Sequence, residues 1–258
     1  MYYPIQVPYV LSEAFSQHIL YSEEVVDSLQ DFVICIWEMK PRSSDVAVVT
    51  HVIVADGCID LVVDYDNREV GFAGMSRTKF DDAILAPLRL CGVRMKPGEF
   101  EQLTGMPATA AMDSFVSLEA IDTNFDRDAF FEGSFDEVKE RLKGCLQHLA
   151  DGKQSNDFVN LFDALSQSLP SKTDEIYEMF HLSPRQCQRL FMKHFGFTPQ
   201  MALSIVRFQH CLEILTSRQS KPSEVLEVTA YYDQSHFIKD FKRNIGLTPF
   251  EYLEKYKK

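Results

Sequence analysis

The chain has 258 residues, of which 45% are hydrophobic and 25% charged, and its formal net charge is −12. This composition is typical of a globular protein and excludes a collagen-like, low-complexity or largely disordered chain. No run of about 18 apolar residues is present, and the N-terminal segment lacks the basic start and apolar run of a secretory signal. We therefore expect a cytoplasmic protein without a transmembrane helix or a membrane partner.

Six cysteines are scattered singly, without a CxxC pair or a histidine at metal-ligand spacing. A disulfide framework suits small secreted chains rather than a chain of this length, which holds enough apolar residues for a core. We predict that all six thiols are reduced and mostly buried, and that the protein holds no metal and no cofactor. The six residues are Cys35, Cys58, Cys91, Cys145, Cys187 and Cys211.

The predicted fold class is α+β, and residues 1–122 form its β-rich part. Short apolar or alternating runs are separated by turn signals such as Asp56-Gly57, which indicates a mainly antiparallel sheet folded into a barrel or a sandwich. Strands are expected at residues 32–37, 46–49, 51–54, 59–63, 70–72 and 88–95, and helices near 22–31 and 98–105. A sensory or regulatory role is the expectation for this part.

Residues 123–155 predict a helical connector. Ser134 is an N-cap and Glu137 completes a capping box, ahead of apolar residues at helical spacing: Phe135, Val138, Leu142, Cys145, Leu146 and Leu149. Residues 153–156 are the most linker-like stretch of the chain, and we place the domain boundary there. The apolar stripe has two interpretations, since it either packs on its own domain or forms a dimer seam.

The end of the chain differs from the rest in charge. Residues 171–258 hold 13 Lys and Arg against 10 Asp and Glu, a net of +3, whereas residues 1–170 carry a net of −15. A mildly basic C-terminal domain therefore follows an acidic one. Because neutralised phosphates supply most of the non-specific affinity for nucleic acid, that affinity is expected to be modest.

A repeat at an offset of 50 residues lies in this mildly basic part. Phe, a basic residue, Gly, Thr and Pro recur in register in residues 191–199 and 241–249. Each copy closes a predicted helix-turn-helix unit, one at about 172–196 and the other at about 222–246. Residues 156–258 are therefore expected to form an all-α domain.

The start of each second helix supports this interpretation. Ser183 is an N-cap followed by Pro184 at the first helical position, a favoured beginning, and Asp233 has the capping position in the other unit. A buried helix of about 19 residues, 199–217, joins the units and spans roughly 28 Å. Such a rod holds two helices about one DNA turn apart, roughly 34 Å, so that both reach successive major grooves.

Both second helices expose Arg, Lys and Gln with a single acid, Asp240, between them. Arg or Lys reads guanine and Gln reads adenine in the major groove, so the pattern is that of two recognition helices. The outward residues are Arg185, Gln188, Arg189, Met192 and Lys193 in the first unit, and Gln234, Ser235, Ile238, Lys239, Lys242 and Arg243 in the second.

Residues 156–258 resemble the AraC/XylS family of bacterial transcription regulators. The matching motifs are Leu182-Ser183-Pro184-Arg185, Gln188-Arg189-Leu190-Phe191, Arg207-Phe208, Tyr231 through Phe237, and Phe241 through Pro249. The resemblance implies two helix-turn-helix units that bind double-stranded DNA sequence-specifically. Residues 56–61 and 92–98 are more weakly similar to the sensory domains of some members of this family. Further candidate partners are a small-molecule effector, a second copy of the chain and RNA polymerase.

Carried over by position, the family's base-reading residues are Arg185, Gln188, Arg189, Gln234, Ser235, Ile238 and Lys239. Phosphate contacts are expected from Lys193, Thr198, Lys242, Arg243 and Thr248, since helix N-termini attract phosphate. His236 and Phe237 match a family motif, and packing and capping explain both.

Four positions depart from the family's pattern. The small residue usual four places before each turn is Tyr177 in the first unit and Leu226 in the second, and this bulk is expected to push the two helices of a unit apart. The turn glycines are replaced by His181 and Ala230, and a positive φ at Ala230 would cost on the order of 1 kcal/mol. The groove fit of each unit is therefore left open.

Two other functions compete with DNA binding. An enzyme would use Cys58 or Cys91 as nucleophile, or His51 with Asp56 and Asp60 as a metal or acid–base group, but no catalytic motif supports either. A regulator that works only through a protein partner would use the front domain as an interaction module, and the sequence does not separate this from ligand sensing. One apolar cluster is a candidate pocket lining, although core packing explains it as well: Phe15, Ile19, Leu20, Trp37, Phe72 and Phe80. We predict a DNA-binding transcription regulator that is not an enzyme, with its ligand-binding residues unassigned.

Overall fold

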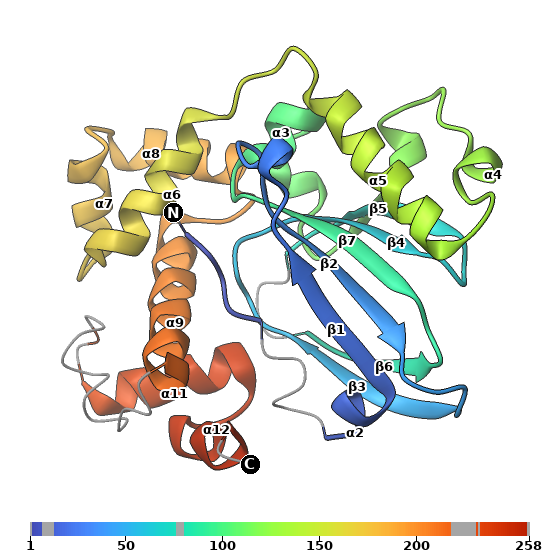
Figure 1. Ribbon diagram of the computed structural model, residues 1–258. Coiled ribbons are helices and arrows are strands. Elements are labelled where there is room, and N and C mark those ends of the chain that lie inside the picture. The colour runs from blue at the N-terminus through green and yellow to red at the C-terminus, as the bar shows by residue number, and fades with distance from the viewer. Residues whose placement is uncertain (1, 7–12, 76–79, 218–230, 232, 257–258) are drawn as a thin grey trace.

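The computed structural model describes residues 2–6, 13–75, 80–217, 231 and 233–256. A front region built on antiparallel strands is followed by a back region of helices, and the two lie side by side (Figure 1). This arrangement confirms the predicted fold class. The expected helix at 222–229, with Leu226 and Ala230 beside the second turn, lies outside the described residues.

A six-stranded antiparallel sheet forms the body of the front region, in the order β1-β2-β7-β4-β5-β8. Its strands are β1 (Ile19–Glu24), β2 (Val33–Pro41), β7 (Leu90–Met95), β4 (Asp60–Asp64), β5 (Glu69–Ala73) and β8 (Phe115–Ser117). Two further strands, β3 (Ala47–Ile53) and β6 (Phe80–Ala86), pair with each other as a second small sheet. Val49 of β3 packs in one cluster with Trp37 and Met39 of β2, so the two sheets form a sandwich.

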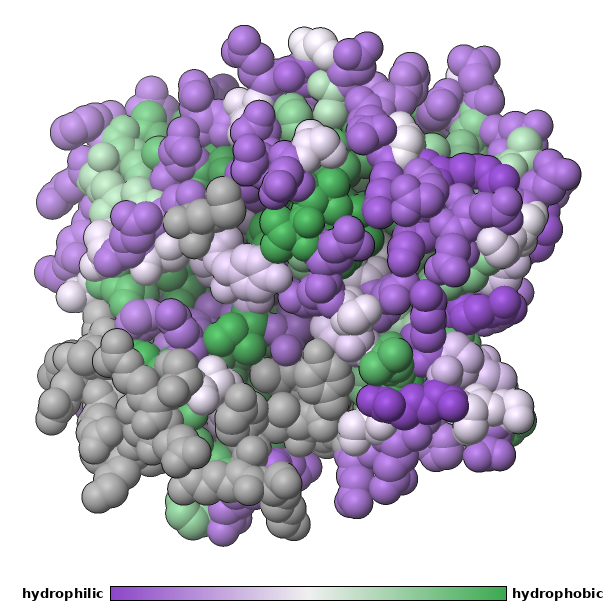
Figure 2. All heavy atoms as spheres, viewed as in Figure 1, coloured by the Kyte–Doolittle hydropathy of each residue, from purple (hydrophilic) through white to green (hydrophobic). Residues whose placement is uncertain are grey.

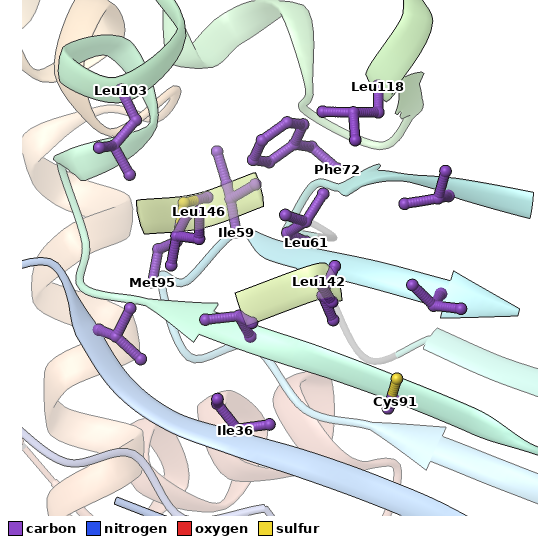
Figure 3. Packing of buried hydrophobic residues seen from close by; sticks show 14 of the residues in the cluster. Ile36, Ile59, Leu61, Phe72, Cys91, Met95, Leu103, Leu118, Leu142 and Leu146 are labelled. Carbon is purple, nitrogen blue, oxygen red and sulfur yellow. The ribbon is translucent and has the colours of Figure 1, made fainter. Parts of the chain in front are cut away.

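The two faces of the large sheet differ because side chains alternate along each strand. On β4, Leu61 and Val63 are fully buried on the face covered by helices, whereas Asp60 and Asp64 point to the other face. The helices α3 (Glu99–Thr104) and α5 (Phe135–Ala150) cover the apolar face, where Leu146 lies near Ile59 and Met95 and Leu142 lies near Leu61 (Figure 3).

One predicted element of the front region is wrong. The helix expected near 22–31 is replaced by strand β1 and a 3₁₀ turn, η1 (Asp27–Leu29). Residues 19–24 pair along their whole length with β2, from Ile19 opposite Pro41 to Glu24 opposite Ile36. This long-range pairing overrides the local helical preference. The helix expected near 98–105 is present as α3.

The helix α5 has the predicted capping box between Ser134 and Glu137. Its apolar residues Phe135, Val138, Leu142 and Leu146 are buried in the core of the front region. Its outer face is hydrophilic, as is most of this corner of the surface (Figure 2). The stripe is therefore occupied within its own domain, which is the first of the two interpretations above. Two short helices lead to it, η3 (Leu118–Ala120) and α4 (Arg127–Phe130).

The back region consists of helices packed around one long helix, α9 (Pro199–Ser217). The helices α6 (Asp157–Ser168), α7 (Thr173–Met179) and α8 (Pro184–His194) precede it, and α11 (Gln234–Ile245) and α12 (Pro249–Tyr256) follow it. The first half of α9 shares a buried cluster with α6, α7 and α8, and its second half shares another with α11 and α12. The long helix thus connects two small cores.

The N-terminal strap, which we define as residues 2–6, lies between the two regions and runs beside α9 (Figure 1). The Tyr2 nitrogen donates to Asp163 on α6 over 2.7 Å, and the Ile5 nitrogen donates to Gln209 on α9 over 2.7 Å. Gln6 donates to Asp56 of the front region over 2.7 Å. The strap therefore ties the sandwich to the helical region.

Candidate nucleic-acid interface

The first unit is formed by α7 and α8. Ser183 caps α8 through a capping box with Gln186, and Pro184 has the first helical position. The turn requires the left-handed conformation at His181, which has φ +52°. Tyr177 is half-buried against the cluster that holds Ile176 and Phe191, and its carbonyl still accepts the turn hydrogen bond from the Leu182 nitrogen over 3.0 Å. The larger side chain is accommodated without loss of the turn.

One face of α8 is buried and the other is free. Cys187 and Phe191 are fully buried, while Arg185, Gln188 and Arg189 are exposed on the opposite side. Within the described part of the chain, neither Arg185 nor Arg189 forms an ion pair. Their guanidinium groups are thus available to ligands with hydrogen-bond acceptors, such as the edge of guanine.

The helix α11 repeats this design in the second unit. The Asp233 side chain accepts from the His236 nitrogen over 2.7 Å, so Asp233 is the N-cap. Phe237 is buried, and the exposed His236 ring contacts the Tyr231 ring with a centroid distance of 5.2 Å. Packing and capping thus account for these two motif residues.

The outer face of α11 differs from that of α8 in one respect. Gln234, Ser235 and Lys239 are exposed, but Ile238 is half-buried against the second core. Each helix therefore exposes three polar base-reading candidates, but α8 has two arginines among them and α11 has none.

The predicted phosphate contacts are in different environments. Thr198 and Thr248 accept from the nitrogens of Met201 and Glu251, over 3.2 and 3.3 Å, and so cap α9 and α12. Arg243 is paired with Asp240 and donates to the Ser204 hydroxyl over 2.7 Å. Lys242 is exposed.

Lys193 has a partner that sequence reasoning missed. Its ammonium lies 3.0 Å from the Glu101 carboxylate, which belongs to α3 in the front region. The same carboxylate lies 3.2 Å from His194 Nδ1, at the end of α8. No local signal in the sequence links residue 101 to residue 193, because the contact depends on how the two regions pack.

The end of α8 is fitted closely to the front region. Gly196 has φ +80°, and a Cβ there would lie 3.0 Å from the carbonyl oxygen of Ala108 in η2 (Ala108–Ala110). The His194 ring stacks on Phe158 with a centroid distance of 4.0 Å. Burial lowers the pKa of His194, an effect that Glu101 opposes. The front region therefore holds the C-terminal turn of the first recognition helix.

The residues proposed for an enzyme do not form a reactive site. Burial raises the pKa of the Cys58 thiol well above its ordinary value and that of Cys91 to about 12, so neither is an activated nucleophile. Within the described residues, no three His, Cys, Asp or Glu side chains are placed to hold a metal ion. His51, Asp56 and Asp60 are thus not assembled as a metal site.

The residues considered as a pocket lining do not gather around one pocket. Phe15, Ile19 and Trp37 share one buried cluster, whereas Phe72 lies in the core under the helices and Leu20 is exposed. The side chain of Phe80 lies outside the described residues.

Comparison with known proteins identifies two parts of the chain. Residues 176–255 match a family described as a helix-turn-helix domain, and residues 26–117 match a domain of unknown function (DUF6597). No curated protein matches the chain. Within the part of the chain that the structure describes, no helix is long and apolar enough to cross a membrane.

Solved structures with similar folds include two bacterial proteins. The C-terminal domain of AraT, a response regulator from Geobacillus stearothermophilus, is 21% identical over 37% of this chain and 81% of its own, with a TM-score of 0.35. ToxT from Vibrio cholerae is 8% identical over 92% of this chain and 98% of its own, with a TM-score of 0.43.

The capped helices on one long helix, in a region that matches a helix-turn-helix family, define a DNA-binding transcription regulator. Residues 176–255 therefore form a helix-turn-helix domain.

Proposed function

We propose that α8 and α11 enter successive major grooves of one DNA site. The two helices are mounted on the two halves of α9, whose 19 residues span roughly 28 Å. That length suits a spacing of about one helical turn of DNA between two recognition helices. The observation that carries the proposal is the exposed and unpaired Arg185 and Arg189 on α8, in register with the exposed face of α11.

In this proposal the bases are read by two unequal sets of side chains. Arg185, Gln188 and Arg189 read one half-element, and Gln234, Ser235, Ile238 and Lys239 read the other. Because Ile238 is half-buried and apolar, its contact would be to a thymine methyl group. The phosphates would be held by Lys193, Thr198, Lys242, Arg243 and Thr248, which surround these faces.

The front region would regulate this binding through Glu101. A DNA phosphate that approaches Lys193 has to compete with the carboxylate 3.0 Å away. An effector or a second copy of the chain that shifts α3 would change this competition, and so change DNA affinity by favouring one arrangement of the regions.

Selection from a random duplex library with the full-length protein, at two salt concentrations, tests the proposal. We expect a motif of two half-elements about 10 base pairs apart. The double variant Arg185→Ala and Arg189→Ala should select only one of the two half-elements. Lys172→Ala is the matched control, since it removes an exposed cation at the N-terminus of α7 rather than on α8. A single half-element for the native protein, or an unchanged motif for the double variant, would overturn the two-groove proposal.

A further inference from the structure

A cavity of about 570 Å³ lies between the two sheets of the front region. Its walls are mostly apolar and come from both sheets, with Val62 and Leu90 on one side and Val52 and Ile84 on the other. The Trp37 ring forms part of its floor and fits only because Gly92 has no side chain, since a Cβ there would lie 2.4 Å from the ring. A cavity of this size suits a small organic molecule.

The polar part of the cavity is built around Arg94. Its side chain is only 6% exposed, and Nη1 lies 3.1 Å from Glu23. Its Nε lies 3.7 Å from Asp56 and 3.6 Å from Asp60, so the charges interact, but no hydrogen bond to this buried nitrogen forms within the described residues.

The formal charges of this group are unbalanced. Among the described residues, the Arg94 guanidinium faces three carboxylates, those of Glu23, Asp56 and Asp60, and Asp64 also lines the cavity. Asp60 accepts from Trp37 Nε1 over 2.7 Å, and burial raises its pKa to about 6 despite the opposing effect of Arg94. A positive charge in the cavity would relieve this cost, because Coulomb interactions are strong where water is excluded.

We propose that this cavity binds a small molecule with an apolar body and one protonated amine, with the ammonium placed against Asp60 and Asp56 and beside the Trp37 ring. The aromatic ring adds a cation–π contribution to the attraction of the carboxylates. A ligand carboxylate is disfavoured, since Arg94 is already surrounded by acids that would repel it.

The position of the cavity gives its occupant a route to the DNA-binding region. Asp56 accepts from Gln6 of the N-terminal strap, and Ala55 accepts from Gln209 of α9 over 3.1 Å. Ala55 and Asp56 both line the cavity. An ammonium that binds Asp56 therefore lies beside a residue that is hydrogen-bonded to the N-terminal strap. The effect of the ligand on DNA binding rests on the proposed function. The proposed class of ligand is independent of it.

Two matched series of probes test the ligand class on the full-length protein: octylamine, octanol and octanoate, and 4-phenylbutylamine, 4-phenylbutanol and 4-phenylbutanoate. Calorimetric titration should show that at least one amine binds about tenfold more tightly than its alcohol, and that neither carboxylate binds. Asp60→Asn, which keeps an acceptor for Trp37, should remove the preference for the amine and leave alcohol binding unchanged. Asp45→Asn, an exposed aspartate outside the cavity, is the control.

A carboxylate that binds as tightly as its amine, amines that bind no better than their alcohols, or an unchanged preference in Asp60→Asn would overturn the proposal. Thermal melting of each variant verifies its fold. DNA binding of the same preparations separates the two hypotheses. If the native protein shows no preference for the amine but binds DNA sequence-specifically, the ligand class alone is refuted, whereas amine binding by the native protein without sequence-specific DNA binding refutes the proposed function alone.

Discussion

Two glutamates of α3 contact the back region through different chemistry. Glu99 is completely buried, and one of its carboxylate oxygens accepts from the Ser155 hydroxyl and from the Asn156 nitrogen. Glu101 is half-buried and makes ion pairs with Lys193 and His194. The contribution of Glu99 to stability therefore depends on whether its carboxyl group is protonated, whereas Glu101 holds the end of α8 through its ion pairs.

Glu99→Gln should make the stability of the protein less sensitive to pH between about 4.5 and 7. Burial raises the pKa of Glu99 from 4.5 to about 7, so the folded state holds a proton that the unfolded state has released. The free energy of unfolding therefore falls as pH rises from about 4.5 to about 7. Glutamine keeps an oxygen that accepts from Ser155 and Asn156 but does not titrate. The fall in unfolding free energy with pH, on the order of 1–3 kcal/mol, should therefore disappear. Denaturant midpoints at pH 5 and pH 8 measure it, and parallel pH curves for the two proteins would contradict the assignment.

Arg189 and Lys193 lie one turn apart on α8 and should differ in what they recognise. Arg189→Ala should cost about 1–3 kcal/mol of discrimination at one base position. Lys193→Ala should weaken binding to all sequences about equally and flatten the salt slope by less than about one, because the ion pair with Glu101 already neutralises part of its charge. Titrations of a selected site and of single-base variants at several salt concentrations distinguish them. If both substitutions weakened all sequences uniformly, Arg189 would not read a base.

At the scale of the element, α8 is held at both ends by different parts of the chain. Its first turn is fixed locally by Ser183 and Gln186, and its last turn by α3 and η2 of the front region. The recognition helix thus cannot move relative to the sandwich without breaking the contacts of Glu101.

Glu101→Gln should increase DNA affinity for all sequences, because it releases the Lys193 ammonium from its ion pair. The salt slope should become steeper at the same time, since one more cation is available to displace counterions. Binding isotherms across a range of salt concentrations measure both effects. Glu132→Gln, an exposed glutamate near α5, controls for the change in net charge. An equal effect of both substitutions would show that the ion pair does not restrain Lys193.

Elements with local signals could be predicted from the sequence, and elements that depend on distant partners could not. The helices α8 and α11 follow from Ser183, Asp233 and the helix-ending glycines, all of which act within a few residues. Strand β1 was mistaken for a helix because its stability comes from pairing with β2. The strands β6 and β8 were missed for the same reason.

The features of the candidate site also fall into those that local sequence predicts and those that depend on distant partners. The exposed faces of the recognition helices follow from periodicity and from the repeat. The pairing of Lys193 with Glu101 and the buried Arg94 group could not be predicted, since each joins residues from strands or helices that are distant in sequence.

At the scale of the whole molecule, the cavity and the DNA-binding region share Gln209 as a connection. Its side chain accepts from the strap and donates to the wall of the cavity, so it contacts both sides of the junction. A change at either site has this short path through which to affect the other.

Gln209→Leu should separate ligand binding from DNA binding. We expect the amine to bind and the DNA motif to be recognised as before, but the amine should no longer change DNA affinity. DNA titrations with and without saturating amine measure the coupling, and Gln200→Ala, an exposed position on α9, is the control. A shift in affinity equal to that of the native protein would show that the coupling takes another path.

The strap also places a constraint on the order of events during synthesis. Its residues leave the ribosome before those of the helical region, yet Tyr2 and Ile5 bind residues 161 and 204 positions later in the chain. The sandwich can pair its strands once Ser117 has emerged, and Gln6 can then bind Asp56, but the partners of Tyr2 and Ile5 on α6 and α9 are made later. The strap is therefore fixed to the sandwich first and to the helical region only after α9 has been translated.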